Sequence, residues 1–127
     1  PGFNRLFRYT HLARFTHTTA LGAYAGMPLH EIVRVGGRAS GSRVLARDAA
    51  TVADRLERGE GIEQATNQQF SIPGLWTTVV ATTAERGDLP GGLSELARAY
   101  ENRGSSRQSD RACRSVGTRS RVREPRG

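Results

Sequence analysis

Three short segments built around glycine most constrain what this chain can fold into, because each combines residues that end one helix and start another. Glycine just beyond a helix can adopt the left-handed conformation that satisfies the last carbonyls, and proline in the first turn of the next helix loses no hydrogen bond. We call these segments the first, second and third hinge: Gly26-Met27-Pro28-Leu29, Gly59-Glu60-Gly61-Ile62 and Glu85-Arg86-Gly87-Asp88-Leu89. In the third hinge, Asp88 can accept from the free amides of the next helix. The hinges predict helices that follow one another closely.

Apolar side chains recur at helical spacing in the segments that the hinges separate. We expect one long helix over residues 5–25, then a short helix after Pro28 that ends at Gly36-Gly37 or soon after. Residues 39–42 form a loop in which Ser40 or Ser42 is the candidate N-cap of the third helix. The third and the last helix share one periodic pattern: Leu45, Ala49, Val52 and Leu56 in the third, Leu89, Leu93, Leu96 and Tyr100 in the last. Asp54 and Arg58 are expected to pair on the outside of the third helix.

Residues 74–86 are ambiguous, because residues 77–83 are rich in β-branched side chains that favour a strand. A helix is favoured because Trp76, Val79, Val80 and Thr83 share one helical face, and no partner strand is evident elsewhere. Pro73 is expected at the start of this helix, after a short fourth helix near Ile62. The predicted fold is all-α: a compact six-helix bundle of antiparallel helices over residues 1–103. A disordered Arg-rich tail is predicted over residues 104–127.

The positive charge is concentrated in that tail. The chain of 127 residues has a net charge of +7, yet residues 1–102 carry 11 Arg against 10 acids, and residues 103–127 carry 8 Arg against 2 acids. Few large aliphatic residues follow Arg103, so this segment cannot bury enough apolar surface to order itself. All 19 basic residues are Arg, which excludes the lysine-dependent chemistry of P-loops and Schiff bases. Cys113 is the single cysteine, so no internal disulfide can form and a reducing compartment is expected.

The order of the hinges resembles the cytoplasmic repeat of the type II secretion system F family, over residues 12–101. The resemblance rests on motifs in the same order and spacing as the family pattern: Ala13-Arg14-Phe15, Ala25-Gly26-Met27-Pro28-Leu29, Gly59-Glu60, Phe70 with Pro73, Glu85-Arg86-Gly87-Asp88-Leu89 and Tyr100-Glu101. Pro1-Gly2 is similar to the lead-in of the second of the family's two repeats. The start also lacks an initiator Met and a signal peptide, so an interior segment of a longer protein is expected.

The resemblance implies a non-enzymatic scaffold of the inner-membrane platform in type II secretion or type IV pilus assembly. It implies a position on the cytoplasmic face of the bacterial inner membrane, binding to the assembly ATPase and to other platform proteins, and possible self-association. The candidate site residues are those that match the family motifs: Phe15, Gly26, Pro28, Leu29, Gly59, Glu60, Pro73, Glu85, Gly87, Leu89, Tyr100 and Glu101.

Two departures from the family pattern are visible. Thr83-Ala84 stands where the family favours Gly-Glu, and Arg86 stands where it favours Ser. After Tyr100-Glu101 the family continues into a membrane-spanning helix, whereas this chain continues into the Arg-rich segment. A cut chain, an altered reading frame and a relative without its membrane anchor all agree with that difference.

No residues in the sequence form a recognisable catalytic, cofactor-binding or metal-binding pattern. His11 and His17 are six residues apart and do not share a helical edge. Ser40 is one place off the spacing of a nucleophile elbow. Asp54, Glu57, Glu60 and Glu63 alternate with Arg55 and Arg58, which is typical of a solvated helix face rather than of an acid/base or calcium site.

Glu85 and Gly87 of the third hinge fit helix termination better than partner contact.

Two other interpretations of the whole chain compete with the scaffold. The Arg-rich segment 103–127 is the basis of the alternative function, binding of nucleic acid or an anionic surface, although it lacks the aromatic residues and the docking fold that specificity requires. A helical-repeat adaptor is disfavoured because the hinges are unequally spaced.

Overall fold

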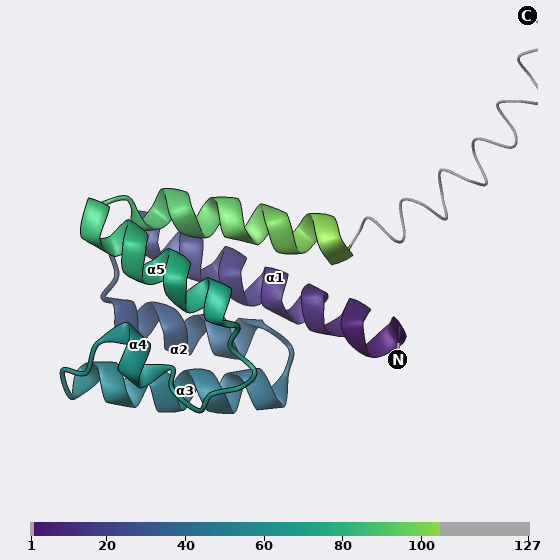
Figure 1. Cartoon of the computed structure of the whole chain (residues 1–127), viewed down its shortest axis with the longest axis horizontal. Coiled ribbons are helices and arrows are strands. Elements are labelled where there is room, and N and C mark those ends of the chain that lie inside the picture. The colour runs from purple at the N-terminus through teal and green to yellow at the C-terminus, as the bar shows by residue number, and fades with distance from the viewer. Residues whose placement is uncertain (1, 105–127) are drawn as a thin grey trace, which may run out of the picture.

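A computed structural model describes residues 2–104, with side-chain surroundings from residue 7 onward. All regular structure in this part of the chain is helical, which confirms the predicted all-α six-helix bundle. The helices are α1 (Gly2–Tyr24), α2 (Leu29–Ala39), α3 (Arg43–Glu57), α4 (Ile62–Ala65), α5 (Gly74–Arg86) and a last helix over residues 89–104 (Figure 1). The predicted disordered tail lies outside the described residues, apart from residue 104, which ends the last helix.

The core forms where α1, α5 and the last helix face α2 and α3. Phe15 and Trp76 are fully buried there, with their ring centroids 5.1 Å apart. Tyr100 is also buried and packs near Tyr9. Burial of large aromatic side chains contributes much of the hydrophobic stabilisation of a small domain. Phe15, Trp76 and Tyr100 are therefore core residues.

The β-branched segment is helical, as predicted, and α5 shows why. Trp76 and Val80 lie on its buried face, so tertiary packing outweighs the strand propensity of the neighbouring threonines. The hydroxyl of Thr83 donates to the carbonyl of Val79 at 2.6 Å, and that of Thr82 donates to Thr78. These bonds to the preceding turn satisfy the threonine hydroxyls without leaving the helix.

Helix α2 packs against both α1 and α3, and two adjacent glycines near its C-terminal end make this possible. A Cβ atom on Gly36 would lie 2.7 Å from Cγ2 of Thr19 on α1, and one on Gly37 would lie 2.6 Å from Cβ of Ala49 on α3. Both distances are shorter than atomic contact allows. The sequence predicted that α2 would end at the glycine pair or soon after it, and the helix ends two residues later, at Ala39. The pair itself lies inside the helix, where it allows the close approach of two neighbours.

The loop between α2 and α3 is fixed by serine hydroxyls. Ser42 is the N-cap of α3, and its Oγ accepts from the amide of Leu45 at 3.2 Å, as one of the two predicted candidates. Ser40 is buried, and its Oγ donates to the carbonyl of Gly37 at 2.7 Å. Nδ1 of His11 lies 2.8 Å from the carbonyl oxygen of Ser40, which connects this loop to α1.

The helices run back and forth along the long axis of the bundle, so the connections alternate between its two ends (Figure 1). All three hinges lie at one end, which we call the hinge end. The N-terminal end of α1, residues 40–42, residues 66–73 and residue 104 lie at the other, which we call the open end. None of the helices in residues 2–104 combines the length and the hydrophobicity that a bilayer-spanning segment requires.

Gly37→Ala should test the close packing of α2 on α3. Alanine normally favours a helix over glycine by about 1 kcal/mol, but here its Cβ would overlap Ala49, so we expect a net loss of about 1 to 3 kcal/mol in the free energy of unfolding. Urea denaturation followed by circular dichroism measures it. Gly74→Ala is the matched control, because open space surrounds this first residue of α5. Equal stability of the two variants would contradict the packing argument.

The buried phenol of Tyr100 predicts a loss of stability at alkaline pH. Its hydroxyl has no hydrogen-bond partner among the described residues, and burial raises the pKa of Tyr100 from 10.0 to about 12. The unfolded chain releases this proton near pH 10 and the folded chain only near pH 12. The free energy of unfolding should therefore be undiminished below pH 10 and fall as the pH rises further, by about 2 kcal/mol at pH 12.

Tyr100→Phe is the control for this pH dependence. At neutral pH the variant should match the original chain or exceed it by up to about 1 kcal/mol, because the lost hydroxyl has no partner. Urea titrations should cover the range from about one pH unit below the ordinary tyrosine pKa to about two units above it, roughly pH 9 to 12. Over this range the free energy of unfolding should fall more steeply for the original chain than for the variant. Parallel declines would show that Tyr100 is not the group responsible.

Candidate partner-binding surface

The three hinges have the same backbone structure, although their sequences differ. In each, a glycine with positive φ follows the helix: Gly26 at 77°, Gly59 at 95° and Gly87 at 74°. The predicted left-handed conformation is confirmed at all three positions. Glycine is favoured there because a Cβ atom makes this conformation costly.

Paired backbone hydrogen bonds close each helix in the arrangement known as a Schellman motif. At the first hinge, the amides of Gly26 and Met27 donate to the carbonyls of Ala23 and Gly22, both at 3.1 Å. The equivalent bonds at the second hinge run from Gly59 to Leu56 at 3.0 Å and from Glu60 to Arg55 at 3.1 Å, and those at the third from Gly87 to Ala84 at 3.1 Å and from Asp88 to Thr83 at 2.8 Å. The hinges are thus fixed corners rather than mobile linkers.

An aliphatic side chain follows each corner and packs against the core. Leu29, Ile62 and Leu89 are the first residues of their helices, and all three are partly buried on the core cluster. Pro28 occupies the N-cap of α2, with φ −60° and ψ 147°. It therefore lies one residue before the first helical turn in which the sequence placed it. The helix starts are fixed by this combination of glycine, N-cap and buried aliphatic residue.

The backbone corners themselves are exposed at the hinge end. Gly26, Gly59, Glu85 and Gly87 are exposed and Glu60 is half-buried. Tyr24 precedes the first hinge and is 65% exposed, which is unusual for so large an aromatic ring. Its hydroxyl lies 3.5 Å from Oγ of Ser94 in the second turn of the last helix. The hinge end therefore presents an aromatic side chain on a rigid surface.

The hinge end is also acidic. In residues 17–35, 49–65 and 77–96, which make up this half of the bundle, eight acids face four Arg. The acids are Glu31, Asp54, Glu57, Glu60, Glu63, Glu85, Asp88 and Glu95, and the basic residues are Arg34, Arg55, Arg58 and Arg86. The hinge end therefore combines an exposed tyrosine with a surplus of negative charge.

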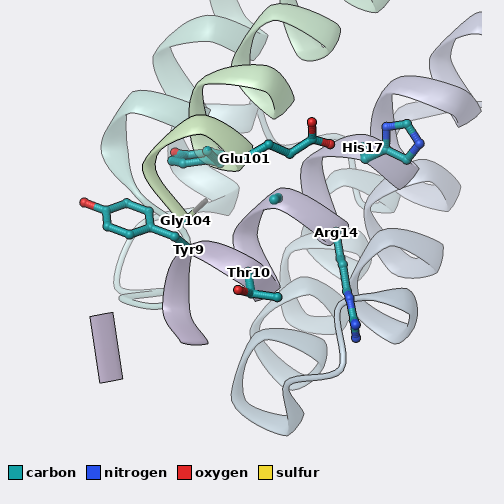
Figure 2. Close-up of a pocket in the computed structure, with 8 residues that line it drawn as sticks. Tyr9, Thr10, Arg14, His17, Glu101 and Gly104 are labelled. Carbon is teal, nitrogen blue, oxygen red and sulfur yellow. The ribbon is translucent and has the colours of Figure 1, made fainter. Parts of the chain in front are cut away.

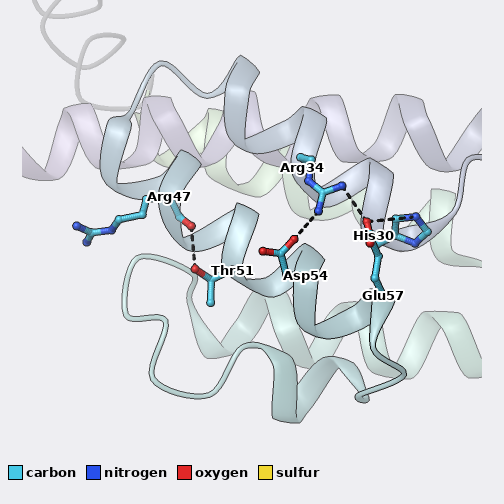
Figure 3. A network of polar contacts seen from close by, with 6 residues as sticks. All are labelled: His30, Arg34, Arg47, Thr51, Asp54 and Glu57. Atoms are coloured by element: carbon cyan, nitrogen blue, oxygen red, sulfur yellow. Dashed lines mark hydrogen bonds and ion pairs between the residues drawn. The ribbon is translucent and has the colours of Figure 1, made fainter.

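Two of these acids, Asp54 and Glu57 of α3, form ion pairs with Arg34 of α2. Arg34 donates to Oδ1 of Asp54 at 2.7 Å and to Oε1 of Glu57 at 2.9 Å, and Nε2 of His30 lies 3.9 Å from the same Glu57 oxygen (Figure 3). The hydrogen bond with Glu57 is the main cause of a raised pKa of Arg34. The predicted partner of Asp54 was Arg58 on its own helix; the structure pairs Asp54 with Arg34 instead.

The sequence reading missed Arg34 and a second polar residue, Asp48. The carboxylate of Asp48 is largely buried and accepts from the hydroxyl of Ser71 at 2.6 Å and from its amide at 3.3 Å. It therefore holds the loop before α5 against α3. A single acid inside the apolar pattern of α3 was the available signal. Within residues 7–104 no three His, Cys, Asp or Glu residues are placed to hold a metal ion.

The remaining motif residues lie away from the hinges. Phe15 is in the core, and Pro73 is the N-cap of α5 at the open end. Tyr100 and Glu101 line a shallow pocket of about 430 Å³ between α1 and the last helix. Figure 2 shows the side chain of Glu101 extending toward His17, whereas Arg14 points away from both. The structure thus brings together the hinge residues and separates them from the other motif residues.

Alanine at the three corner glycines should measure the cost of the left-handed conformation. We expect Gly26→Ala, Gly59→Ala and Gly87→Ala each to lower the free energy of unfolding by about 1 kcal/mol. In the part of the chain that the structure describes, no neighbouring atom lies within 4 Å of the Cβ position at any of these sites, so the effect comes from the backbone alone. Thermal denaturation is the measurement. Gly61→Ala is the control, because Gly61 has φ −70° and equal open space; a similar loss there would contradict the assignment.

Comparison with known proteins gives a consistent result. Residues 15–113 match the family described as "Type II secretion system (T2SS), protein F". The chain is 26% identical over 102 residues to type II secretion system protein F of Pseudomonas aeruginosa, and 29% identical over 101 residues to the type 4 fimbrial assembly protein PilC of Pseudomonas putida. Each match covers 80% of this chain and 25% of the relative, so the chain spans about a quarter of the length of these relatives.

Proposed function

Because this chain belongs to the type II secretion system protein F family, we propose that it is a non-enzymatic scaffold domain of a secretion or type IV pilus platform. In this proposal it lies on the cytoplasmic face of a bacterial inner membrane and binds the assembly ATPase and other platform proteins. Self-association of the domain belongs to the same proposal. The names of the relatives, a secretion protein and a fimbrial assembly protein, support a role in such a machine.

The observation that carries the proposal is the position of the hinges. The motifs that mark the family lie far apart in the sequence, yet the bundle collects the hinges at one exposed end. Each corner is closed by backbone bonds, so the surface keeps its shape before a partner arrives. A surface that needs no ordering loses little conformational entropy on binding. These properties suit a scaffold that transmits force or position between partners.

The partner that fits the hinge end is a protein with a basic surface. Tyr24 supplies an exposed aromatic side chain. Exposed carboxylates come from Glu85, which is in the third hinge, and from Glu63, which directly follows the second hinge. Exposed tyrosine residues are frequent hot spots, and surrounding charges select the partner and its orientation. We therefore assign the contact with the assembly ATPase or an adjoining platform protein to this end.

A pull-down of the full chain against the cognate ATPase and platform proteins tests the proposal. Tyr24→Ala and the double variant Glu63→Arg/Glu85→Arg should each weaken binding by roughly tenfold or more, since each removes contacts that contribute about 1 to 3 kcal/mol to the binding free energy. Phe70→Ala is the matched control: it also removes an exposed aromatic ring, but at the open end. Its binding should equal that of the original chain.

The outcomes separate the function from its location. Absence of binding by the original chain to every platform protein and to the ATPase would contradict the scaffold proposal. Binding that is lost in Phe70→Ala but kept in the Tyr24 and Glu variants would retain the scaffold and move the contact to the open end. Circular dichroism of each variant shows whether the helices are intact, and all of these side chains are exposed.

A further inference from the structure

The open end of the bundle has the opposite charge to the hinge end. In residues 7–16, 36–48, 66–76 and 97–104, which make up this half, seven Arg face two acids: Arg8, Arg14, Arg38, Arg43, Arg47, Arg98 and Arg103 against Asp48 and Glu101. Asp48 is bonded to Ser71, and its Oδ1 lies 3.8 Å from Nε of Arg47, so it offsets the charge of that Arg. The other six Arg still outnumber Glu101. The small net charge of the folded domain therefore conceals a strong polarity along its long axis.

Large apolar side chains project from the same end. Phe70 is 87% exposed in the loop before α5, Phe7 is 57% exposed on α1, and Val44 is 52% exposed in the first turn of α3. The three surround a shallow groove of about 400 Å³ that Arg8 also lines. Exposed apolar residues gathered in one place, rather than scattered singly, mark an interaction surface.

Polar contacts beneath the groove hold its aromatic residues in place. Phe7 stacks on His11, with ring centroids 6.4 Å apart, and His11 is in turn bonded to the carbonyl of Ser40. Ser71, which follows Phe70, is bonded to Asp48 through both its amide and its hydroxyl. The loop that carries Phe70 is therefore tied to α3 while the ring itself remains in solvent. This arrangement presents the ring outward instead of folding it into the core.

We propose that the open end is a docking surface for an anionic lipid bilayer. Phe7, Val44 and Phe70 would enter the boundary between headgroups and acyl chains, and Arg8, Arg43 and Arg47 would contact lipid phosphates. Aromatic and aliphatic side chains ringed by Arg are the composition that binds this interface. The three Arg residues are exposed, and each basic residue near an anionic membrane adds to the attraction. The proposal concerns the open end and does not depend on which protein binds the hinge end.

The chemistry favours a bilayer over other anionic partners. Nucleic acid would use the Arg residues, but it offers no apolar phase to a protruding phenylalanine outside a stacking groove. A basic protein would be repelled by the charge of this end. The Arg-rich residues 105–127 follow the last helix in sequence, and their charge alone would bind any polyanion. The apolar residues are therefore what distinguishes the proposed surface from simple charge attraction.

Co-sedimentation of the full chain with vesicles tests the proposal, comparing pure phosphatidylcholine with phosphatidylcholine that contains phosphatidylglycerol. The chain should bind the anionic vesicles and not the neutral ones. Phe70→Ser should weaken this binding by roughly tenfold, the effect of removing one large apolar side chain from an apolar phase. Arg43→Glu/Arg47→Glu should weaken it by roughly tenfold or more. Tyr24→Ser and Arg58→Glu, the matched changes at the hinge end, should leave binding unchanged.

A fluorescent variant reports the depth of contact directly. In Phe70→Trp the new indole should be quenched by brominated lipids in anionic vesicles, whereas the native Trp76 is fully buried and serves as the unquenched reference. Absence of quenching in a chain that still sediments with vesicles would overturn the proposal. Equal binding by the Phe70→Ser variant and the original chain would also overturn it, because it would assign binding to charge in residues 105–127.

Competition with DNA separates a bilayer from a general polyanion site. A DNA duplex should displace the chain only through charge, so Phe70→Ser should bind DNA as the original chain does while losing its affinity for vesicles. If Phe70→Ser weakened binding to DNA and to vesicles equally, the surface would be a polyanion site and the bilayer proposal would be wrong. Thermal unfolding of each variant should match the original chain, since the altered side chains are exposed.

Discussion

Helix α2 lies between α1 and α3 at a distance that only glycine permits, and the arrangement of the bundle depends on that contact. Gly36 faces Thr19 and Phe15 on one side, and Gly37 faces Ala49 on the other. Because the backbone of α2 is so close to both neighbours, Val33 and Phe15 are fully buried, and the ring of Phe15 packs against that of Trp76. A larger residue at Gly36 would push α2 away from α1, and one at Gly37 would push it away from α3, which would loosen the core around the aromatic pair.

The close packing of α2 also determines where nearby polar groups find hydrogen-bond partners. Ser40, the first residue after α2, is buried and bonds back to the carbonyl of Gly37, while His11 binds the carbonyl of Ser40 itself. On the exposed side of the same helix, Arg34 reaches Asp54 and Glu57 because α2 and α3 are adjacent there. Such surface ion pairs contribute only modestly to stability, so the close packing at the glycines, rather than these pairs, holds α2 against α3.

Local features were predictable from the sequence because their causes are local. The left-handed glycines, the Ser42 cap and the periodic faces of α3 and the last helix depend on neighbouring residues in the chain, and the structure confirms them. The role of Gly36 and Gly37 was not predictable in this way, because the sequence alone does not distinguish a glycine pair that ends a helix from one that allows close packing inside it. Only the positions of Thr19 and Ala49, both distant in sequence, show that the pair serves close packing.

The candidate surfaces depend on topology for the same reason. The sequence identified the hinges singly, but it did not show that an alternating chain places Gly26, Gly59 and Gly87 at one end and the loop bearing Phe70 at the other. Phe70 was treated as a family motif residue, and its exposure becomes evident only when Ser71 is seen to bind Asp48 beneath it.

The polarity of the bundle follows from the same alternation. Helices that reverse direction at every connection bring together charges that are remote in the chain, so the near balance of 11 Arg and 10 acids in residues 1–102 separates into an acidic and a basic end. The two ends also differ in their apolar residues: Tyr24 lies at the acidic end, and Phe7, Val44 and Phe70 lie at the basic end. A domain with two chemically distinct ends can bind two different partners at once in a defined orientation. That property requires no catalytic group, because the length of the helices alone separates the two ends.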